Sequence, residues 1–126
     1  MRLKAMGLPS AEFHHPQHLE VAFFYIRRYG CTEGSLSTFR AIEAYALHLG
    51  HADRFHATLT ICWIRLIAAT LVVHPDCCTL DALLLRHPVL LDKHLPRKFY
   101  SQPLLDSDRA RRGWTEPDLR PLPATF

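Results

Sequence analysis

Apolar residues recur at helical spacing along most of the chain, and no alternating run is long enough to require a strand. The first periodic segment runs from Pro16 to about Tyr29, and Gly30 is a natural stop for a helix. A second segment begins among the capping-type residues 32–37 and continues to Gly50. Together the two segments predict antiparallel helices joined by a short turn.

The third segment, from about Arg54 to Val73, is apolar around most of its circumference. Asp53 is the expected N-cap, and His74-Pro75 is the expected end, because the residue before a proline is pushed out of the helical region. A helix that is apolar on nearly all sides must be covered by other elements. We therefore expect this helix to form the centre of the molecule.

Shorter elements follow the central segment. In chain order, the pattern predicts a helix from the cap Thr79 to Arg86, a turn from Pro88 to His94 that Pro96 ends, a short helix over 107–113, and an extended tail over 115–126. The 126 residues fit one domain. The predicted fold class is all-α: a small helical bundle around a central apolar helix, with short C-terminal helices, an extended tail, and flexibility over residues 1–12.

Composition and cysteine usage favour a soluble cytoplasmic protein. Hydrophobic residues make up 48% of the chain, which is enough to close one core. The four cysteines contain no C-x-x-C pair, and the N-terminus lacks the apolar run of a signal peptide. The most apolar stretch, Ala57 to Val73, falls short of the roughly 20 residues of a membrane span. Arg65 at its centre would also cost at least about 2.5 kcal/mol on insertion, so no membrane association is expected.

The net positive charge of the chain lies in its last quarter. Residues 1–92 carry as many acidic as basic side chains, whereas residues 93–126 carry seven basic and four acidic ones. Mixed signs of this kind indicate a solvated surface more than a nucleic-acid footprint. Nucleic acid is therefore not the expected partner.

Nine histidines are the strongest compositional oddity, and several fall at predicted helix ends. His15 and His18 lie at the start of the first helix, and His56 lies at the start of the third, which an up-down-up arrangement would bring to one end. Imidazole is a common ligand of divalent transition metals, so these three residues are the candidate metal ligands, with Glu43 as the nearest carboxylate. No H-E-x-x-H motif is present, and turn or capping roles explain the same histidines.

Arg65 is the second candidate, because it lies in the middle of the most apolar helix. A buried guanidinium needs a carboxylate partner, which Glu43 or Asp81 would supply in a structural ion pair. The alternatives are an anion-binding arginine in an interhelical pocket, with Glu43 and Trp63 as further ligand-binding residues, and a surface arginine whose stem covers apolar surface while its charge reaches solvent. Nucleophilic catalysis by the Cys77-Cys78 pair lacks a positioned base in the sequence.

Several short motifs resemble those of a family of small all-helical bacterial proteins without an assigned function. The matching stretches are Phe13 to His18 (F-x-H-x-x-H), Phe55 to Thr58 (F-H-x-T), Tyr100-Ser101, Ala110-Arg111, and the tail from Trp114 through Pro117-Asp118-Leu119 to Pro121-Leu122-Pro123. The resemblance implies an all-helical bundle and draws attention to His15, His18 and His56. The chain departs from the family pattern at Ala57 and Leu49, where a carboxylate and a histidine stand in the pattern, so a general acid or base is missing.

Two functions remain open from the sequence. The first is a small-ligand- or metal-binding helical protein, with or without enzymatic activity, that uses the histidine cluster at one end of the bundle. The second is a non-enzymatic interaction or accessory protein, or a homo-oligomer, that docks through the basic C-terminal region and the proline-rich tail. Neither the substrate nor the oligomeric state follows from the pattern.

Overall fold

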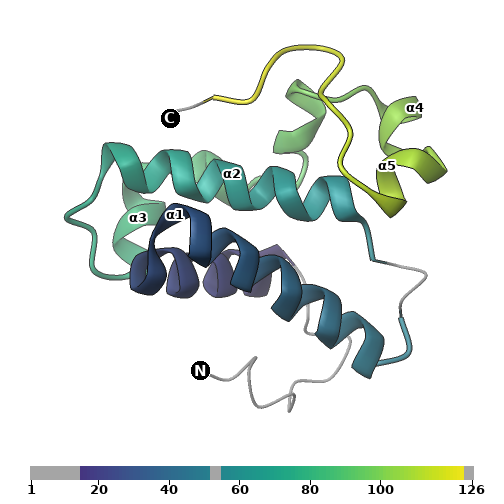
Figure 1. Ribbon diagram of the computed structural model, residues 1–126. Helices are drawn as coiled ribbons and strands as arrows, with labels where there is room; N and C mark the ends of the chain where they lie inside the picture. The colour runs from purple at the N-terminus through teal and green to yellow at the C-terminus, as the bar shows by residue number, and fades with distance from the viewer. Residues whose placement is uncertain (1–14, 52–54, 124–126) are drawn as a thin grey trace.

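The computed structural model describes residues 15–51 and 55–123, and of residues 15–17 it describes only the backbone. The expectation for residues 1–12 lies outside this part of the chain, and so does Asp53 itself. The helix expected to begin near Arg54, with Asp53 as its N-cap, begins instead at Ala57 with His56 as its N-cap. Within the described ranges, the protein is all-α, and Figure 1 shows α2 between α1 on one side and the C-terminal tail on the other. The predicted fold class is confirmed.

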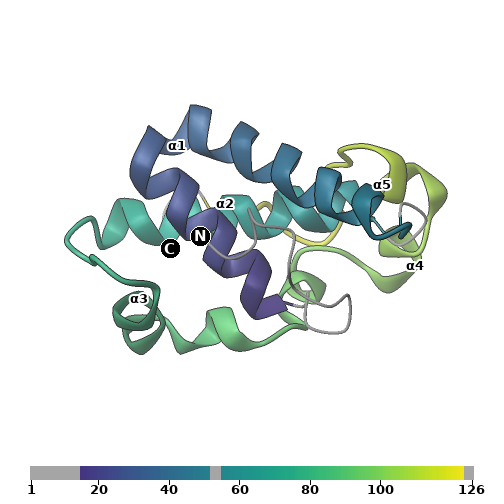
Figure 2. The same ribbon diagram turned by 90° about the horizontal axis from the view of Figure 1, so that it is seen from below.

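The first helical element, α1 (His15–His48), is a hairpin of two helices rather than one continuous rod. Gly30 interrupts the helix with φ 87° and ψ 174°, a backbone conformation that residues other than glycine rarely adopt. The chain reverses there, so the two halves lie side by side at the break and diverge toward their other ends (Figure 2). The predicted stop at Gly30 is therefore confirmed.

The two halves of α1 approach each other most closely at Gly34. A Cβ atom added at Gly34 would lie 2.5 Å from Ile26 Cα and 2.6 Å from the Tyr25 carbonyl oxygen, so only a hydrogen fits there. Next to this contact, the buried Thr38 hydroxyl donates to the Gly34 carbonyl at 2.7 Å. Backbone packs directly on backbone at this point of the hairpin.

The central helix, α2 (Ala57–Val73), carries the core. Its buried side chains include Cys62, Leu66 and Ile67; α2 packs against α1, and the same core cluster also contains Leu83 of α3. A narrow stripe through Arg65 and Val72 stays exposed. The helix is thus covered on most sides, as predicted, but not on all of them, and no helix in the described ranges is long and apolar enough to cross a membrane.

The remaining elements are short, and the three α-helices among them are capped by side chains. They are α3 (Leu80–Arg86), η4 (Pro88–Leu91), η5 (Leu95–Lys98), α4 (Gln102–Leu105) and α5 (Asp108–Arg112). Thr79, the predicted cap of α3, accepts from a backbone N–H group, and so does Ser107 at the start of α5. Pro96 lies in the first turn of η5 and does not end the preceding turn, because proline is tolerated where no N–H is needed. The one-turn helix α4, capped by Ser101, was not expected from the sequence.

Candidate functional site

His56 is the N-cap of α2. Its Nδ1 accepts a hydrogen bond from the Leu59 backbone N–H at 3.1 Å, and its Nε2 lies 2.7 Å from the Leu105 carbonyl oxygen. A backbone N–H only donates and a carbonyl only accepts, so the ring carries its proton on Nε2. The imidazole therefore joins the start of α2 to the end of α4.

These two contacts keep the His56 ring neutral and use both of its nitrogens. Burial lowers its pKa, while the bond to Leu105 partly opposes this effect. The lone pair on Nδ1 is already used by Leu59, so neither ring nitrogen is available to a metal in this conformation. The capping role that the sequence offered as an alternative for His56 is the one that the structure contains.

The other two metal candidates are not brought to His56. His18 is half-buried in the first turns of α1, and the side chain of His15 lies outside the described residues. In both views the start of α1 lies apart from the start of α2, because the two halves of the hairpin diverge (Figures 1 and 2). Among the described residues, no group of three or more histidine, cysteine, aspartate or glutamate side chains could hold a metal ion.

Arg65 is exposed and lies over the ring of Trp114, with its guanidinium carbon 4.4 Å from the ring centroid. Cation–π contacts of this kind form when a cation is within about 6 Å of the aromatic centroid. The expected ion pair with Glu43 or Asp81 is therefore wrong, since the guanidinium is not buried and needs no carboxylate. Glu43 is exposed on α1, and Trp63 is a core side chain.

Four hydrogen bonds fasten the described part of the C-terminal tail to the body of the protein. The Asp118 carboxylate accepts from both the backbone N–H and the hydroxyl of Ser101, at 2.8 and 2.6 Å. The Leu119 N–H donates to the Phe99 carbonyl at 2.9 Å. With the buried Tyr100 hydroxyl donating to the Thr115 carbonyl at 2.7 Å, the tail is a structural clasp as far as Leu119.

Replacing Tyr100 by phenylalanine is expected to destabilise the fold through this clasp. Burial raises the pKa of the Tyr100 hydroxyl, which stays protonated and remains a donor. The variant leaves the Thr115 carbonyl without that donor, which lowers the free energy of unfolding by about 1–2 kcal/mol in urea denaturation. The same substitution at Tyr29, whose side chain is exposed, changes it by less than about 0.5 kcal/mol. Equal effects at the two positions would contradict the clasp.

The acidic residues of the last quarter are largely committed to the chain's own donors. Asp106 accepts a hydrogen bond from Gln102 Nε2 at 2.9 Å, and Glu116 accepts one from Trp114 Nε1 at 3.1 Å. Asp118 accepts from Ser101. Bonding to Ser101 also holds the pKa of Asp118 below its ordinary value. The carboxylates here serve the fold instead of neutralising the neighbouring cations.

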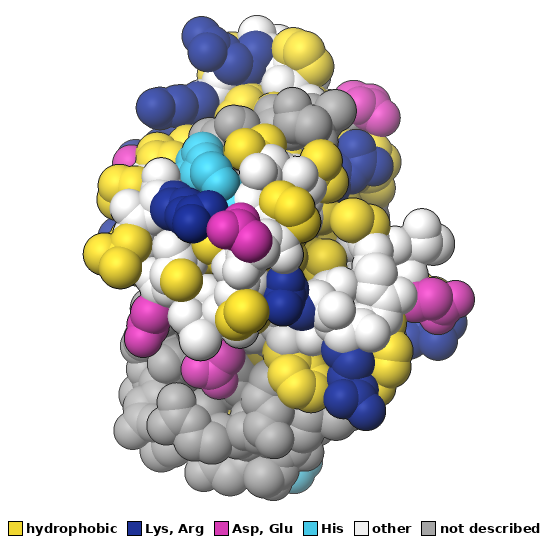
Figure 3. Space-filling view, turned by 90° about the vertical axis from the view of Figure 1, so that its left-hand side faces the viewer, with side chains coloured by type: hydrophobic (Ala, Val, Ile, Leu, Met, Phe, Trp, Pro, Cys, Tyr) yellow, Lys and Arg dark blue, Asp and Glu magenta, His cyan; other side chains and the backbone are white. Residues whose placement is uncertain are grey.

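All seven cations of the same quarter are exposed; the six besides Arg111 are Lys93, Arg97, Lys98, Arg109, Arg112 and Arg120. None of these six side chains forms a hydrogen bond or ion pair with another residue in the described part of the chain. The bond from the Leu119 N–H to the Phe99 carbonyl brings the backbone before Arg120 to the backbone after Lys98, because each cation is the direct neighbour of one of the bonded residues. We call Arg97, Lys98 and Arg120 the basic surface; Lys and Arg side chains gather at the top of Figure 3, on the side that the tail crosses in Figure 1.

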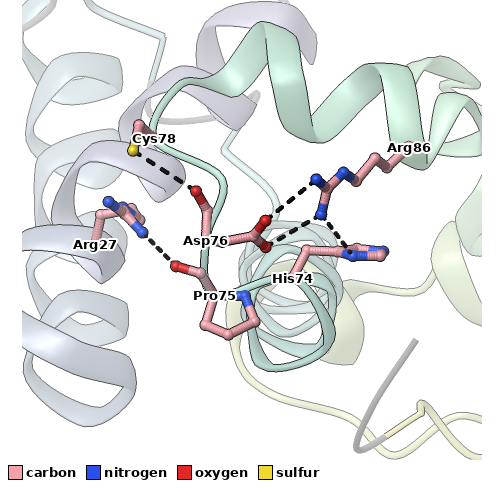
Figure 4. A network of polar contacts seen from close by, with 6 residues as sticks. All are labelled: Arg27, His74, Pro75, Asp76, Cys78 and Arg86. Atoms are coloured by element: carbon pink, nitrogen blue, oxygen red, sulfur yellow. Dashed lines mark hydrogen bonds and ion pairs between the residues drawn. The ribbon is translucent and has the colours of Figure 1, made fainter.

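A second polar cluster lies where α2 ends, and sequence reasoning did not find it as a unit. It joins His74 and Asp76, in the loop after α2, to Arg86 of α3 (Figure 4). His87, which directly follows α3, belongs to the same cluster because its ring lies against that of His74. A histidine or an aspartate beside a helix end is common, and only the packing of α3 against the loop brings these four side chains together. The one sequence signal was the pair of helix ends that His74 and His87 mark before Pro75 and Pro88.

Cys77 and Cys78, the pair considered as nucleophiles, have different environments. Cys77 is buried in the core, and the exposed Cys78 thiol donates to the Asp76 carbonyl at 3.6 Å. This contact provides no base for the thiol.

No protein-family model, no curated protein and no solved structure significantly matches the chain, so its function has to be inferred from its own residues.

Proposed function

We propose that this protein is a non-enzymatic interaction protein that docks an acidic protein partner through its basic surface. The observation that carries the proposal is the difference between acidic and basic side chains in the last quarter of the chain. Three of the four carboxylates there bond to the chain's own donors, while Arg97, Lys98 and Arg120 are exposed and unpaired among the described residues. Unpaired cations attract an acidic partner and raise its association rate.

The basic surface is held in place before any partner arrives. Asp118 and Leu119 fix the tail immediately before Arg120, and η5 carries Arg97 and Lys98 on a turn that is packed against α2. A prearranged surface loses little conformational freedom on binding, which favours affinity. The tail then acts both as a clasp and as a support for the cations.

An exposed leucine within the basic surface favours a protein over a nucleic acid. Leu119 is 57% exposed and lies between the tail clasp and Arg120. Protein interfaces combine an apolar centre with a polar or charged rim, whereas nucleic-acid surfaces rely on more extended arrays of cations. An acidic peptide segment with an apolar side chain matches this combination.

Reversing two charges of the basic surface is expected to weaken binding of an acidic probe. The probe is a fluorescein-labelled polyglutamate peptide, followed by anisotropy at low ionic strength. For Lys98→Glu/Arg120→Glu we expect the Kd to rise at least about tenfold, with a shallower salt dependence, because attraction at this surface becomes repulsion. The matched control is Arg28→Glu/Arg40→Glu, which changes the net charge equally on exposed positions of α1.

The control is expected to bind nearly as the parent does. Equal weakening in both double variants would mean that net charge alone attracts the probe, and it would overturn the assignment to the basic surface. Tighter binding of a DNA duplex than of polyglutamate, under the same conditions, would overturn the choice of a protein partner.

A further inference from the structure

The polar cluster at the end of α2 joins three segments of the fold. His74 follows the last residue of α2, and His87 follows the last residue of α3; their ring centroids lie 4.9 Å apart. Arg86 donates through Nη1 and Nη2 to the two carboxylate oxygens of Asp76, at 3.1 and 3.2 Å. From the other side of the loop, Arg27 of α1 donates to the Pro75 carbonyl at 2.8 Å.

One contact in this cluster requires a neutral histidine. Arg86 Nη1 lies 3.4 Å from His74 Nδ1, and a guanidinium carries only donors. Nδ1 must therefore present its lone pair, with the ring proton on Nε2. A second proton on His74 would turn Nδ1 into a donor facing a donor and would place two positive charges next to each other.

His87 adds to the cost of protonating the cluster. Burial, and secondly the neighbouring His74, lowers the pKa of His87. The charged groups next to the pair include Asp76 in the loop and Arg86 from α3, with the buried Cys77 thiol close to Arg86, whereas Arg27 of α1 lies on the other side of the loop. Asp76 is the single carboxylate that these interactions show in the cluster. When both histidines are protonated, this one negative charge therefore faces the positive charges of His74, His87 and Arg86.

We propose that His74, Asp76, Arg86 and His87 form a proton-sensitive latch that holds α3 to the end of α2 at neutral pH and loosens it in mild acid. The helix that the latch holds is short enough to depend on it. α3 has seven residues and buries Leu83, and so few turns are marginal without tertiary support. Loosening the latch exposes Leu83 and the loop beside it, and this response is independent of the basic surface.

The latch is tested by amide hydrogen exchange at pH 7.5 and pH 5.5, with rates corrected for the intrinsic effect of pH. We expect the protection of residues 80–87 to fall about tenfold relative to that of α2 at the lower pH. Comparing α3 with α2 removes any global effect of other histidines. In His74→Gln/His87→Gln, which has no ring to protonate, the relative loss of protection should disappear.

The matched control is His94→Gln, which removes an exposed histidine outside the cluster. It should keep the full response of the parent. A parent protein whose α3 is equally protected at both pH values, or a double variant that still responds, would overturn the latch. Should the double variant not fold, ring titration of the parent by NMR decides: coupled titration of His74 and His87 supports the proposal, and independent titration of each near 6.5 overturns it.

Discussion

Replacing Gly34 by alanine is expected to lower the free energy of unfolding by about 2–3 kcal/mol, and the melting temperature by roughly 10 °C. The added methyl group would lie 2.5 Å from Ile26 Cα, 2.6 Å from the Tyr25 oxygen and 2.8 Å from the Ile26 nitrogen. All three are backbone atoms, which cannot rotate away as a side chain can. The two halves of α1 would have to separate, and their contacts with α2 would be disturbed with them.

The higher helix propensity of alanine opposes this loss of stability, but its effect is smaller. Alanine is favoured over glycine in a helix by about 1 kcal/mol, and this gain reduces the loss without reversing it. Gly113→Ala is the matched control, since nothing lies within 4 Å of a Cβ atom there and the backbone is extended. Urea denaturation of both variants should show a large loss at Gly34 and almost none at Gly113. A neutral Gly34→Ala would mean that the helices are not in contact at this point.

The sequence predicts the features of this fold that depend on neighbouring residues. Gly30 as a break, Thr79 as a cap, and His74 as the end of α2 are all local effects of backbone conformation and capping. Gly34 is different, because its role comes from Ile26 on the other arm of the hairpin. A glycine inside a helical pattern looks merely unfavourable until its neighbour in space is known.

Arg65 shows why the candidate site was harder to predict than the fold. The apolar run around it suggests burial on all sides, but position 65 falls on the one stripe of α2 that faces Trp114. That tryptophan is far away in the sequence, and its contact satisfies the cation without an acid. The error came from treating a mostly apolar helix as a completely buried one.

The sequence indicates which histidines are unusual, but it does not indicate the partners that they contact. The sequence singled out His56, and its backbone partner on α4 was beyond reach because α4 itself was not predicted. His74 and His87 were not grouped, since their contact depends on how the loop after α2 folds back. Local patterns identify which side chains are unusual, whereas pairings depend on tertiary packing.

The second large effect is expected at His56. Replacing it by alanine removes the N-cap of α2, worth about 1 kcal/mol, and leaves the half-buried Leu105 carbonyl without its donor, which costs about 1–2 kcal/mol more. His56→Asn is the informative comparison. Asparagine caps a helix well, but its side chain is too short to reproduce both bonds, so it should recover only the capping part.

Stability should also depend on pH through this residue. Because burial lowers the pKa of His56 in the folded state, the unfolded chain binds a proton more readily, at a pKa near 6.5. The neutral ring therefore contributes its full stabilisation above about pH 6.5, and this contribution is lost as the pH falls toward the lower pKa of the folded state. Urea denaturation from pH 8 to pH 5 should show a steeper loss of stability for the parent than for His56→Asn. If both proteins lose stability in parallel, the ring of His56 is not the group that stays neutral on folding, and its bonds to Leu59 and Leu105 do not fix its protonation.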